Sequence, residues 1–299
     1  MRVEKLGVAL AASIGFALVA SDASAFCRTT TCDPRQGHVC RKDANGCVID
    51  GIPLSWPARC IGFSLQRDAL PGKISLEQFT TIAHRAFAAW QDVKCPGSEE
   101  QPSLRFFDLG PVACDRHEYN QNQGNANVLM FRTGSWPYAN SGNTLALTTV
   151  TYNVDTGEIY DADIEINGTM PITVGSPVQY DLQSILTHEI GHFIGFAHTQ
   201  DPTATMHDKY QAGGTSLRTL AQDDIEAVCT VYPPNRETPA CDPTPRHGFQ
   251  SECSIETAQA GCCTMAPGHA PDGAHAAGLL GLGLATVYAR RRRSQKSAA

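Results

Sequence analysis

The chain has 299 residues, with 30 acidic and 23 basic side chains and a formal net charge of -7. Outside the two termini no segment concentrates basic residues, which argues against a nucleic-acid-binding protein. Neither a phosphate-binding G-x-x-x-x-G-K-[ST] loop nor a dinucleotide-binding glycine fingerprint is present, so nucleotide chemistry has no support. No internal repeat is evident.

Residues 1–25 predict a signal peptide. A short charged start precedes an apolar run over residues 6–20, and Ala-Ser-Ala at residues 23–25 provides the small side chains of a signal-peptidase site. We expect cleavage after Ala25, so that the exported chain begins at Phe26. The predicted location is the cell envelope or cell surface, or the extracellular space after release.

All twelve cysteines lie after this cleavage site, which is typical of an oxidising compartment and predicts disulfides. Their spacings lack the paired C-x-x-C knuckles of structural zinc sites. Four cysteines fall in residues 26–52, a Cys-rich N-terminal segment with few apolar residues, and we expect disulfides to staple it. Spacing alone leaves the pairing open.

Residues 53–232 carry the apolar patterns of one folded domain. Residues 74–90 predict an amphipathic helix, with Ser75 as its N-cap ahead of Gln78. Four apolar segments predict strands, at residues 104–107, 128–131, 145–152 and 159–166. A turn-rich connection joins the last two and suits a hairpin. A closing helix is expected within residues 220–233, where Cys229 would tie it to another element.

One segment carries the chemistry: His-Glu-Ile-Gly-His-Phe-Ile-Gly-Phe-Ala-His at residues 188–198. His188 and His192 are four apart on one helical face, so both imidazoles reach one metal ion. Gly195 would turn the chain out of the helix at a positive φ and return His198 as the third ligand. Three neutral histidines leave the fourth position of a zinc ion open for water, as catalysis requires. Glu189 is placed to act on that water as general base.

This H-E-x-x-H-x-x-G-x-x-H string, with Met206 eight residues later, resembles the signature of the metzincin zinc peptidases. Residues 198–210 are most similar to matrixins, which read H-S-x-D-P-x-A-x-M-x-P-x-Y there. The resemblance implies an α/β (α+β) metzincin-like fold: a twisted mixed sheet, an active-site helix and a C-terminal subdomain after the zinc motif. It also implies that Met206 forms a hydrophobic floor beneath the zinc and that Tyr210 shapes the primed-side pocket.

Two positions depart from the matrixin pattern. Asp208 stands where many matrixins have proline. His207 adds a fourth histidine near the site, which we interpret as an exposed loop residue rather than a ligand. The P-R-C-G-x-P-D propeptide string is absent, and we expect Cys60 to form a disulfide rather than to serve latency.

Asp161, Asp163 and Glu165 alternate along a predicted strand, so their side chains share one face. Such an oxygen-rich face suits Ca²⁺, and matrixins often carry structural calcium. A solvated acidic face is an equal alternative. We find no His-rich loop for a second, structural zinc and predict none.

Residues 233–271 are rich in proline, glycine and cysteine and predict a disulfide-containing stalk or small module. In residues 272–299 an apolar run at 276–289 precedes four arginines. The run is shorter than the ~17–25 residues that span a bilayer, but the arginines suit a cytoplasmic stop. With Cys262 and Cys263 upstream, the tail resembles the C-terminal sorting signals of myxobacterial surface proteins. This implies membrane or surface anchoring, with one of these cysteines as a processing site.

The pattern as a whole predicts an exported zinc metalloendopeptidase that hydrolyses proteins or peptides. The alternative from another class is a catalytically silent surface binding module or adhesin on the same scaffold, and a non-proteolytic zinc hydrolase is a third reading. The intact Glu189 favours the enzyme, because a silent scaffold has no physical need of the base. In matrixins an extended peptide adds to a sheet edge beside the cleft, but the sequence does not identify the residues of that edge here.

Overall fold

A computed structural model describes residues 26–34, 37–139, 142–254, 280–281 and 286–289. The predicted signal peptide, Cys262, Cys263 and the arginine cluster lie outside the described residues. Everything said of the structure below refers to the described part of the chain.

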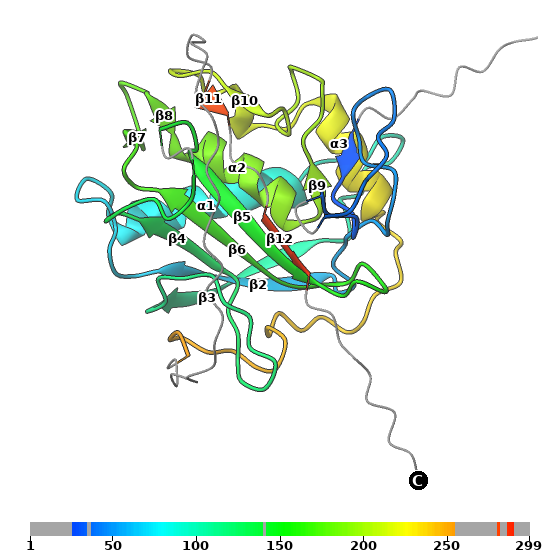
Figure 1. Cartoon of the computed structure of the whole chain (residues 1–299), viewed down its shortest axis with the longest axis horizontal. Coiled ribbons are helices and arrows are strands. Elements are labelled where there is room, and N and C mark those ends of the chain that lie inside the picture. Colours follow the sequence, from blue (N-terminus) through cyan, green and yellow to red (C-terminus); the bar gives the residue numbers. More distant parts are fainter. Residues whose placement is uncertain (1–25, 35–36, 140–141, 255–279, 282–285, 290–299) are drawn as a thin grey trace, which may run out of the picture.

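A twisted mixed sheet of six strands forms the base of the domain, in the order β12-β5-β6-β4-β2-β3 (Figure 1). Its strands are β2 (Cys60–Gln66), β3 (Arg105–Val112), β4 (Val128–Arg132), β5 (Ala146–Tyr152), β6 (Ile159–Asn167) and β12 (Thr286–Ala289). β5 runs antiparallel to β6, whereas β2, β3, β4 and β6 are parallel to one another. The four predicted strands and the predicted β5–β6 hairpin are confirmed, although β3 continues to Val112.

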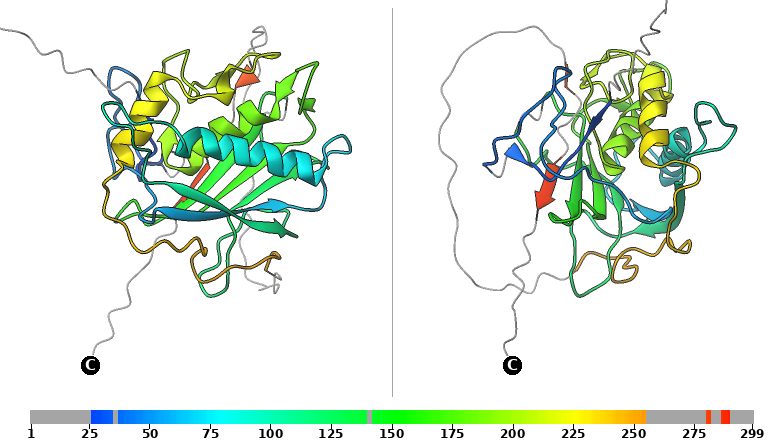
Figure 2. Two further views of the ribbon diagram at one scale, coloured as in Figure 1. Left: turned by 180° about the vertical axis from the view of Figure 1, so that it is seen from behind. Right: turned by 90° about the vertical axis from the view of Figure 1, so that its right-hand side faces the viewer.

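Two helices cover one face of the sheet (Figure 2). Helix α1 (Leu76–Gln91) begins with the predicted capping box between Ser75 and Gln78. Helix α2 (Leu182–Phe193) carries the first part of the zinc motif. Trp90 of α1 is fully buried and donates from its indole nitrogen to the Thr187 carbonyl of α2 at 2.7 Å. The apolar face predicted for α1 therefore supports the helix that carries the site.

The chain after α2 forms a smaller subdomain, as the resemblance to matrixins implied. It contains helix α3 (Gln222–Val231), which is the predicted closing helix. Its short elements are β9 (Phe196–Ala197), β10 (Lys209–Tyr210) and the 3-10 helix η2 (Ser216–Arg218). Two further short strands, β7 (Ile172–Thr173) and β8 (Tyr180–Asp181), precede α2. The N-terminal strand β1 (Cys27–Arg28) pairs with β9, inside the zinc motif.

Five disulfides join the described cysteines: Cys27–Cys47, Cys32–Cys40, Cys60–Cys241, Cys95–Cys229 and Cys114–Cys253. The first two staple the N-terminal segment, as predicted, and the expected disulfide roles of Cys60 and Cys229 are confirmed. The last three close loops of 134 to 181 residues. In the chain-entropy model a closure of that length contributes about 4–5 kcal/mol each.

The described part of the predicted stalk, residues 233–254, belongs to the domain. It passes along the side of the sheet away from the two helices (Figure 2), where Cys60–Cys241 and Cys114–Cys253 fasten it. Arg236 also donates to the Trp56 carbonyl at 2.7 Å. Two non-local disulfides, which spacing could not reveal, hold this segment against the sheet. Residues 255–271 lie outside the described part.

Two pieces of the predicted anchor are described, and both are strands. β11 (Leu280–Gly281) pairs antiparallel with β10, and β12 pairs parallel with β5. The short apolar helix that the sorting-signal resemblance implied is not found in these residues. Across the described residues, no helix has the length and apolar character needed to cross a membrane.

Candidate metal centre

Three histidines converge between α2 and the turn that follows it. His198 Nε2 lies 3.1 Å from His188 Nε2 and 3.2 Å from His192 Nε2. Nitrogens bound to one tetrahedral zinc at ~2.0–2.1 Å lie roughly 3.3 Å apart. Among the described residues, the other His, Cys, Asp and Glu cluster of this size contains the Cys114–Cys253 disulfide, which is not a ligand set. The geometry fits a three-histidine zinc site.

Hydrogen bonds at the opposite ring nitrogens fix which atom faces the metal position. His188 Nδ1 donates to the Thr205 carbonyl at 2.6 Å, and His192 Nδ1 donates to the Phe196 carbonyl at 2.8 Å. With Nδ1 protonated, the Nε2 atoms of His188 and His192 each present a lone pair toward His198 Nε2, as two ligands of a shared metal ion would. Burial lowers the pKa of His192 to about 3 and that of His198 to about 4, so both rings are neutral ligands at neutral pH.

Glu189 lies beside this centre and is fully buried. Its Oε2 accepts a hydrogen bond of 2.6 Å from the Thr148 hydroxyl of β5, and its Oε1 has no partner among the described residues. Burial raises the pKa of Glu189 to about 8, and the Thr148 hydrogen bond works in the opposite direction. A cation at the three histidines would also favour the charged form. The chain thus holds a buried carboxylate with one free oxygen on the residue that directly follows the ligand His188.

Gly195 makes the turn that brings His198 back to the other two histidines. Its φ is +94°, as the sequence predicted, and a Cβ there would lie 2.5 Å from the Leu54 carbonyl oxygen. Its N–H donates to the His192 carbonyl at 2.9 Å. Both the positive φ and the close backbone approach require glycine.

We expect Gly195→Ala to lower both stability and zinc affinity. Gly213→Ala is the matched control, since Gly213 has a φ of +83° but its Cβ would meet nothing closer than 3.8 Å. The positive φ costs about 1–2 kcal/mol at either position. The forced contact with Leu54 adds roughly 1–3 kcal/mol at Gly195 alone. Urea unfolding of the zinc-free proteins measures the difference, and equal losses in the two variants would show that the Leu54 contact is not tight.

The Met-turn is anchored from α3. Asp224 accepts from the N–H of Thr205 at 2.7 Å and from the N–H of Met206 at 3.1 Å. Met206 is buried, and a Cβ on Gly191 of α2 would lie 2.1 Å from its sulfur. Met206 therefore packs directly against the zinc-motif helix. Since the Thr205 carbonyl holds His188, Asp224 supports that ligand indirectly.

Tyr210 and His207 follow the Met-turn. The Tyr210 hydroxyl accepts from the N–H of Asp181, the N-cap of α2, at 2.9 Å and donates to the Gly214 carbonyl at 2.5 Å. Tyr210 thus links the segment after the Met-turn to the active-site helix. The His207 side chain is 17% exposed and its Nε2 lies 3.7 Å from Asp208 Oδ1. It is not part of the three-histidine cluster.

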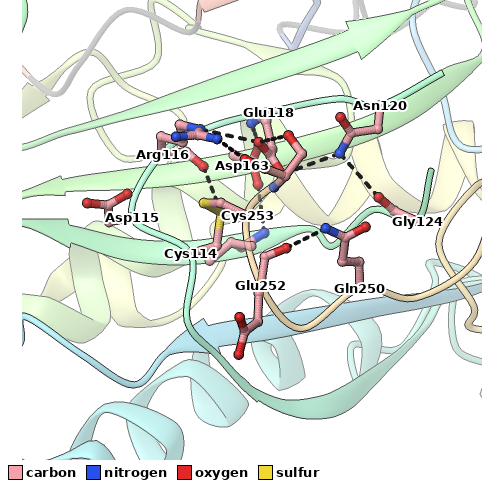
Figure 3. Close-up of a disulfide and its surroundings, with 12 residues drawn as sticks. Cys114, Asp115, Arg116, Glu118, Asn120, Gly124, Asp163, Gln250, Glu252 and Cys253 are labelled. Carbon is pink, nitrogen blue, oxygen red and sulfur yellow. Dashed lines mark hydrogen bonds and ion pairs between the residues drawn. A yellow bond between two sulfur atoms is a disulfide. The ribbon is translucent and has the colours of Figure 1, made fainter. Parts of the chain in front are cut away.

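The acidic side chains of β6 share one face, as predicted, but that face is buried rather than solvated. Glu165 accepts from Tyr138 and forms ion pairs with Arg132 and His117. Asp163 accepts from the N–H groups of Val128 at 2.7 Å and Glu118 at 3.1 Å. Figure 3 shows Asp163 beside Glu118 and Arg116, close to the Cys114–Cys253 disulfide.

These contacts give the predicted calcium site no support, and it stays a prediction. Ca²⁺ takes six to eight oxygen ligands, whereas Arg132, His117 and backbone N–H groups already occupy the oxygens of Glu165 and Asp163. The one carboxylate oxygen of the three residues that is buried without a partner is Asp161 Oδ1. At Glu165, the side chains of Arg132 and His117 form the ion pairs that we had expected with Ca²⁺.

The sequence analysis missed three partners of the zinc motif: Thr148, Thr205 and Asp224. The available signals were weak: a threonine in the middle of an apolar strand, and an aspartate early in the closing helix. None of the three lies within the motif, and each reaches it only through the fold.

Three histidines on a helix and its following turn, above a buried methionine turn, define the metzincin class of zinc peptidase fold. The sequence model of the matrixin family (peptidase M10) matches residues 55–233. This match covers more than half of the sequence, and the chain belongs to the matrixin family.

Individual relatives are distant. Human Matrix metalloproteinase-16 is 26% identical over 203 residues, covering 64% of this chain and 29% of the relative. Metalloendoproteinase 1-MMP of Arabidopsis thaliana is 25% identical over 189 residues, covering 62% of this chain and 46% of the relative. Human Matrilysin is 32% identical over 98 residues, which is 33% of this chain and 35% of the relative. The chain therefore matches less than half the length of each of these proteins.

Proposed function

We propose that this protein is an exported zinc-dependent endopeptidase with Glu189 as its general base. The observation that carries the proposal is the convergence of three histidine Nε2 atoms, together with a buried carboxylate that has a free oxygen on the residue after His188. Membership of the matrixin family supports the same reaction class. Cleavage of a peptide library by the zinc-loaded protein, stopped by a chelator and restored by zinc, tests it.

His188, His192 and His198 are the residues that would hold the zinc. When bound there, the metal supplies Lewis-acid activation of a water molecule and of the scissile carbonyl. Glu189 takes the proton of the attacking water on its free oxygen and delivers it to the leaving amine. The carbonyls of Thr205 and Phe196 keep His188 and His192 in the required tautomer throughout.

β5 supports a proposal for how an extended substrate is held. It is the last strand of the main sheet before β12, and its Thr148 contacts Glu189 directly. A peptide added along the outer edge of β5 would lie next to the base, and its affinity would come from main-chain hydrogen bonds. In the structure β12 is paired with this edge, from Thr149 to Tyr152. A substrate strand on β5 therefore has to displace β12.

Removal of the segment after Ser254 should raise kcat/KM for peptides. The described pieces of that segment pair with two strands near the site, β11 with β10 and β12 with β5. An intramolecular strand competes at an effective concentration in the millimolar range. We expect about a tenfold or greater rise in kcat/KM, carried by KM, when residues 26–254 are compared with residues 26–299.

Val287→Pro in the longer protein is the matched variant, because proline removes a backbone donor from β12 without shortening the chain. Val287 pairs with Val150 of β5. The Val287→Pro variant should reproduce part of the rise in kcat/KM. Equal kcat/KM in all three proteins would mean that β12 does not compete with substrate.

Export is supported by the five disulfides, which form and persist in oxidising compartments. C-terminal anchoring stays a prediction that the described residues do not support. The silent binding module has less support than the enzyme, because Glu189 is retained together with a dedicated hydrogen-bonding partner. Zinc binding without any turnover would favour that alternative.

A further inference from the structure

Glu189 has a single side-chain hydrogen-bonding partner among the described residues, and it comes from the sheet. The Thr148 hydroxyl lies 2.6 Å from Glu189 Oε2 and 3.2 Å from the Glu189 carbonyl oxygen. Thr148 and Glu189 are both 0% exposed. Glu189 Oε1 accepts no hydrogen bond from the described residues. The two oxygens of this carboxylate are therefore not equivalent.

Thr148 is held rigidly. It lies in the middle of β5, opposite Ile164 of β6 in an antiparallel ladder. Its branched side chain has few χ1 choices, so the hydroxyl position follows from the backbone. Successive side chains of a strand point to opposite faces, so Thr148 points to α2 while its neighbour Thr149 points to the other face.

The free oxygen of Glu189 is costly for a purely structural role. A buried carboxylate oxygen without a partner loses its hydration and gains nothing in return. Glu165, by contrast, has both oxygens satisfied, through Arg132, His117 and Tyr138. The arrangement at Glu189 instead keeps one oxygen fixed by Thr148 and leaves the other without a partner among the described residues.

We propose that Thr148 is a positioning residue for the general base, an inference that rests on the proposed function. Its hydroxyl donates to Oε2 throughout the reaction, which leaves Oε1 as the oxygen that receives the proton of the attacking water. The same Oε1–H bond then breaks as the proton passes to the leaving amine. Because β5 would also carry the substrate strand, this one strand would position both the bound peptide and, through Thr148, the general base.

The test compares three single substitutions in the zinc-loaded protein. Thr148→Val removes the hydroxyl and keeps the branched shape. Thr148→Ser keeps the hydroxyl. Ser64→Ala is the control, since Ser64 of β2 is also buried with a hydroxyl that has no partner among the described residues, and it lies away from the proposed substrate edge.

We expect Thr148→Val to lower kcat by about 10- to 100-fold, the usual effect of misplacing a catalytic group by up to 1 Å. KM and bound zinc should stay at the wild-type values, since neither substrate nor metal ligand is touched. Thr148→Ser should recover most of kcat, and Ser64→Ala should retain it. A Thr148→Val enzyme as active as Ser64→Ala would overturn the proposal.

A second measurement does not depend on turnover. If the wild-type protein cleaves nothing, the proposed function fails, and crystal structures of the zinc-loaded wild type and Thr148→Val decide on Thr148 alone. The proposal expects one carboxylate orientation in the wild type and a rotated or split Glu189 in the variant. An unchanged Glu189 in the variant would overturn it.

Discussion

Glu189→Gln should reduce kcat by about 10²–10⁴-fold, the range that general-base catalysis contributes. The amide cannot accept the proton of the attacking water, but it keeps the size and shape of the side chain. Its carbonyl oxygen can still accept from the Thr148 hydroxyl, which lies 2.6 Å from Oε2 in the structure. Steady-state kinetics on an internally quenched peptide gives the value.

Stability and zinc content provide the controls for this variant. Glu189 is not one of the three converging ligands, so bound zinc should be unchanged. Folding should not suffer, because the variant replaces a fully buried acid by a neutral amide of the same size. A Glu189→Gln protein that keeps zinc and retains substantial cleavage would refute the assignment of the base.

His198→Ala should weaken zinc binding more than 100-fold, and His207→Ala should leave it unchanged. His198 contributes one of three converging nitrogens, whereas His207 is a neighbour outside that cluster. Removal of a residue that only orients a metal ligand lowers the metal affinity by about 10–100-fold. Removal of the ligand itself should therefore lower the zinc affinity by more. A substitution outside the ligand set is expected to stay within about twofold.

The increase in thermal stability on adding zinc compares the same two variants, His198→Ala and His207→Ala. Zinc at about 1,000 times its Kd stabilises the folded wild type by about 4 kcal/mol. That increment should persist in His207→Ala and disappear in His198→Ala at the same zinc concentration. An equal loss in the two variants would mean that His207 belongs to the ligand set, contrary to the geometry.

The ligands could be predicted from the sequence because they lie within one helix and one turn. The spacing of His188 and His192 fixes their common face, and the turn at Gly195 returns His198 at a distance that local geometry decides. The same holds for the β5–β6 hairpin and the capping box of α1, both of which are confirmed. Local periodicity carries this information without reference to the rest of the chain.

Features that depend on distant segments could not be predicted in the same way. Thr148 and Glu189 are 41 residues apart, and Asp224 is 19 residues from Thr205. The acidic face of β6 follows from alternation, but its burial and its pairing with Arg132 depend on how other segments pack over it. The calcium site stays a prediction for this reason: the pattern of carboxylates was visible in the sequence, whereas the pairing of Glu165 with Arg132 and His117 was not.

The described part of the expected stalk illustrates the same limit. Proline, glycine and cysteine in residues 233–254 indicated a segment without its own core, which agrees with the single turns and bridges seen there. The pairing of Cys241 with Cys60 and of Cys253 with Cys114 decides that this segment lies on the sheet.

The most direct test of the central claim is mass-spectrometric mapping of a diverse peptide library after incubation with purified protein comprising residues 26–254. Zinc-loaded protein should cut internal peptide bonds, and a chelator should stop the cutting until zinc is restored. The Glu189→Gln protein, equally zinc-loaded, should leave the library intact. No internal cleavage by a folded, zinc-loaded protein would contradict the account and favour a binding module on the matrixin scaffold.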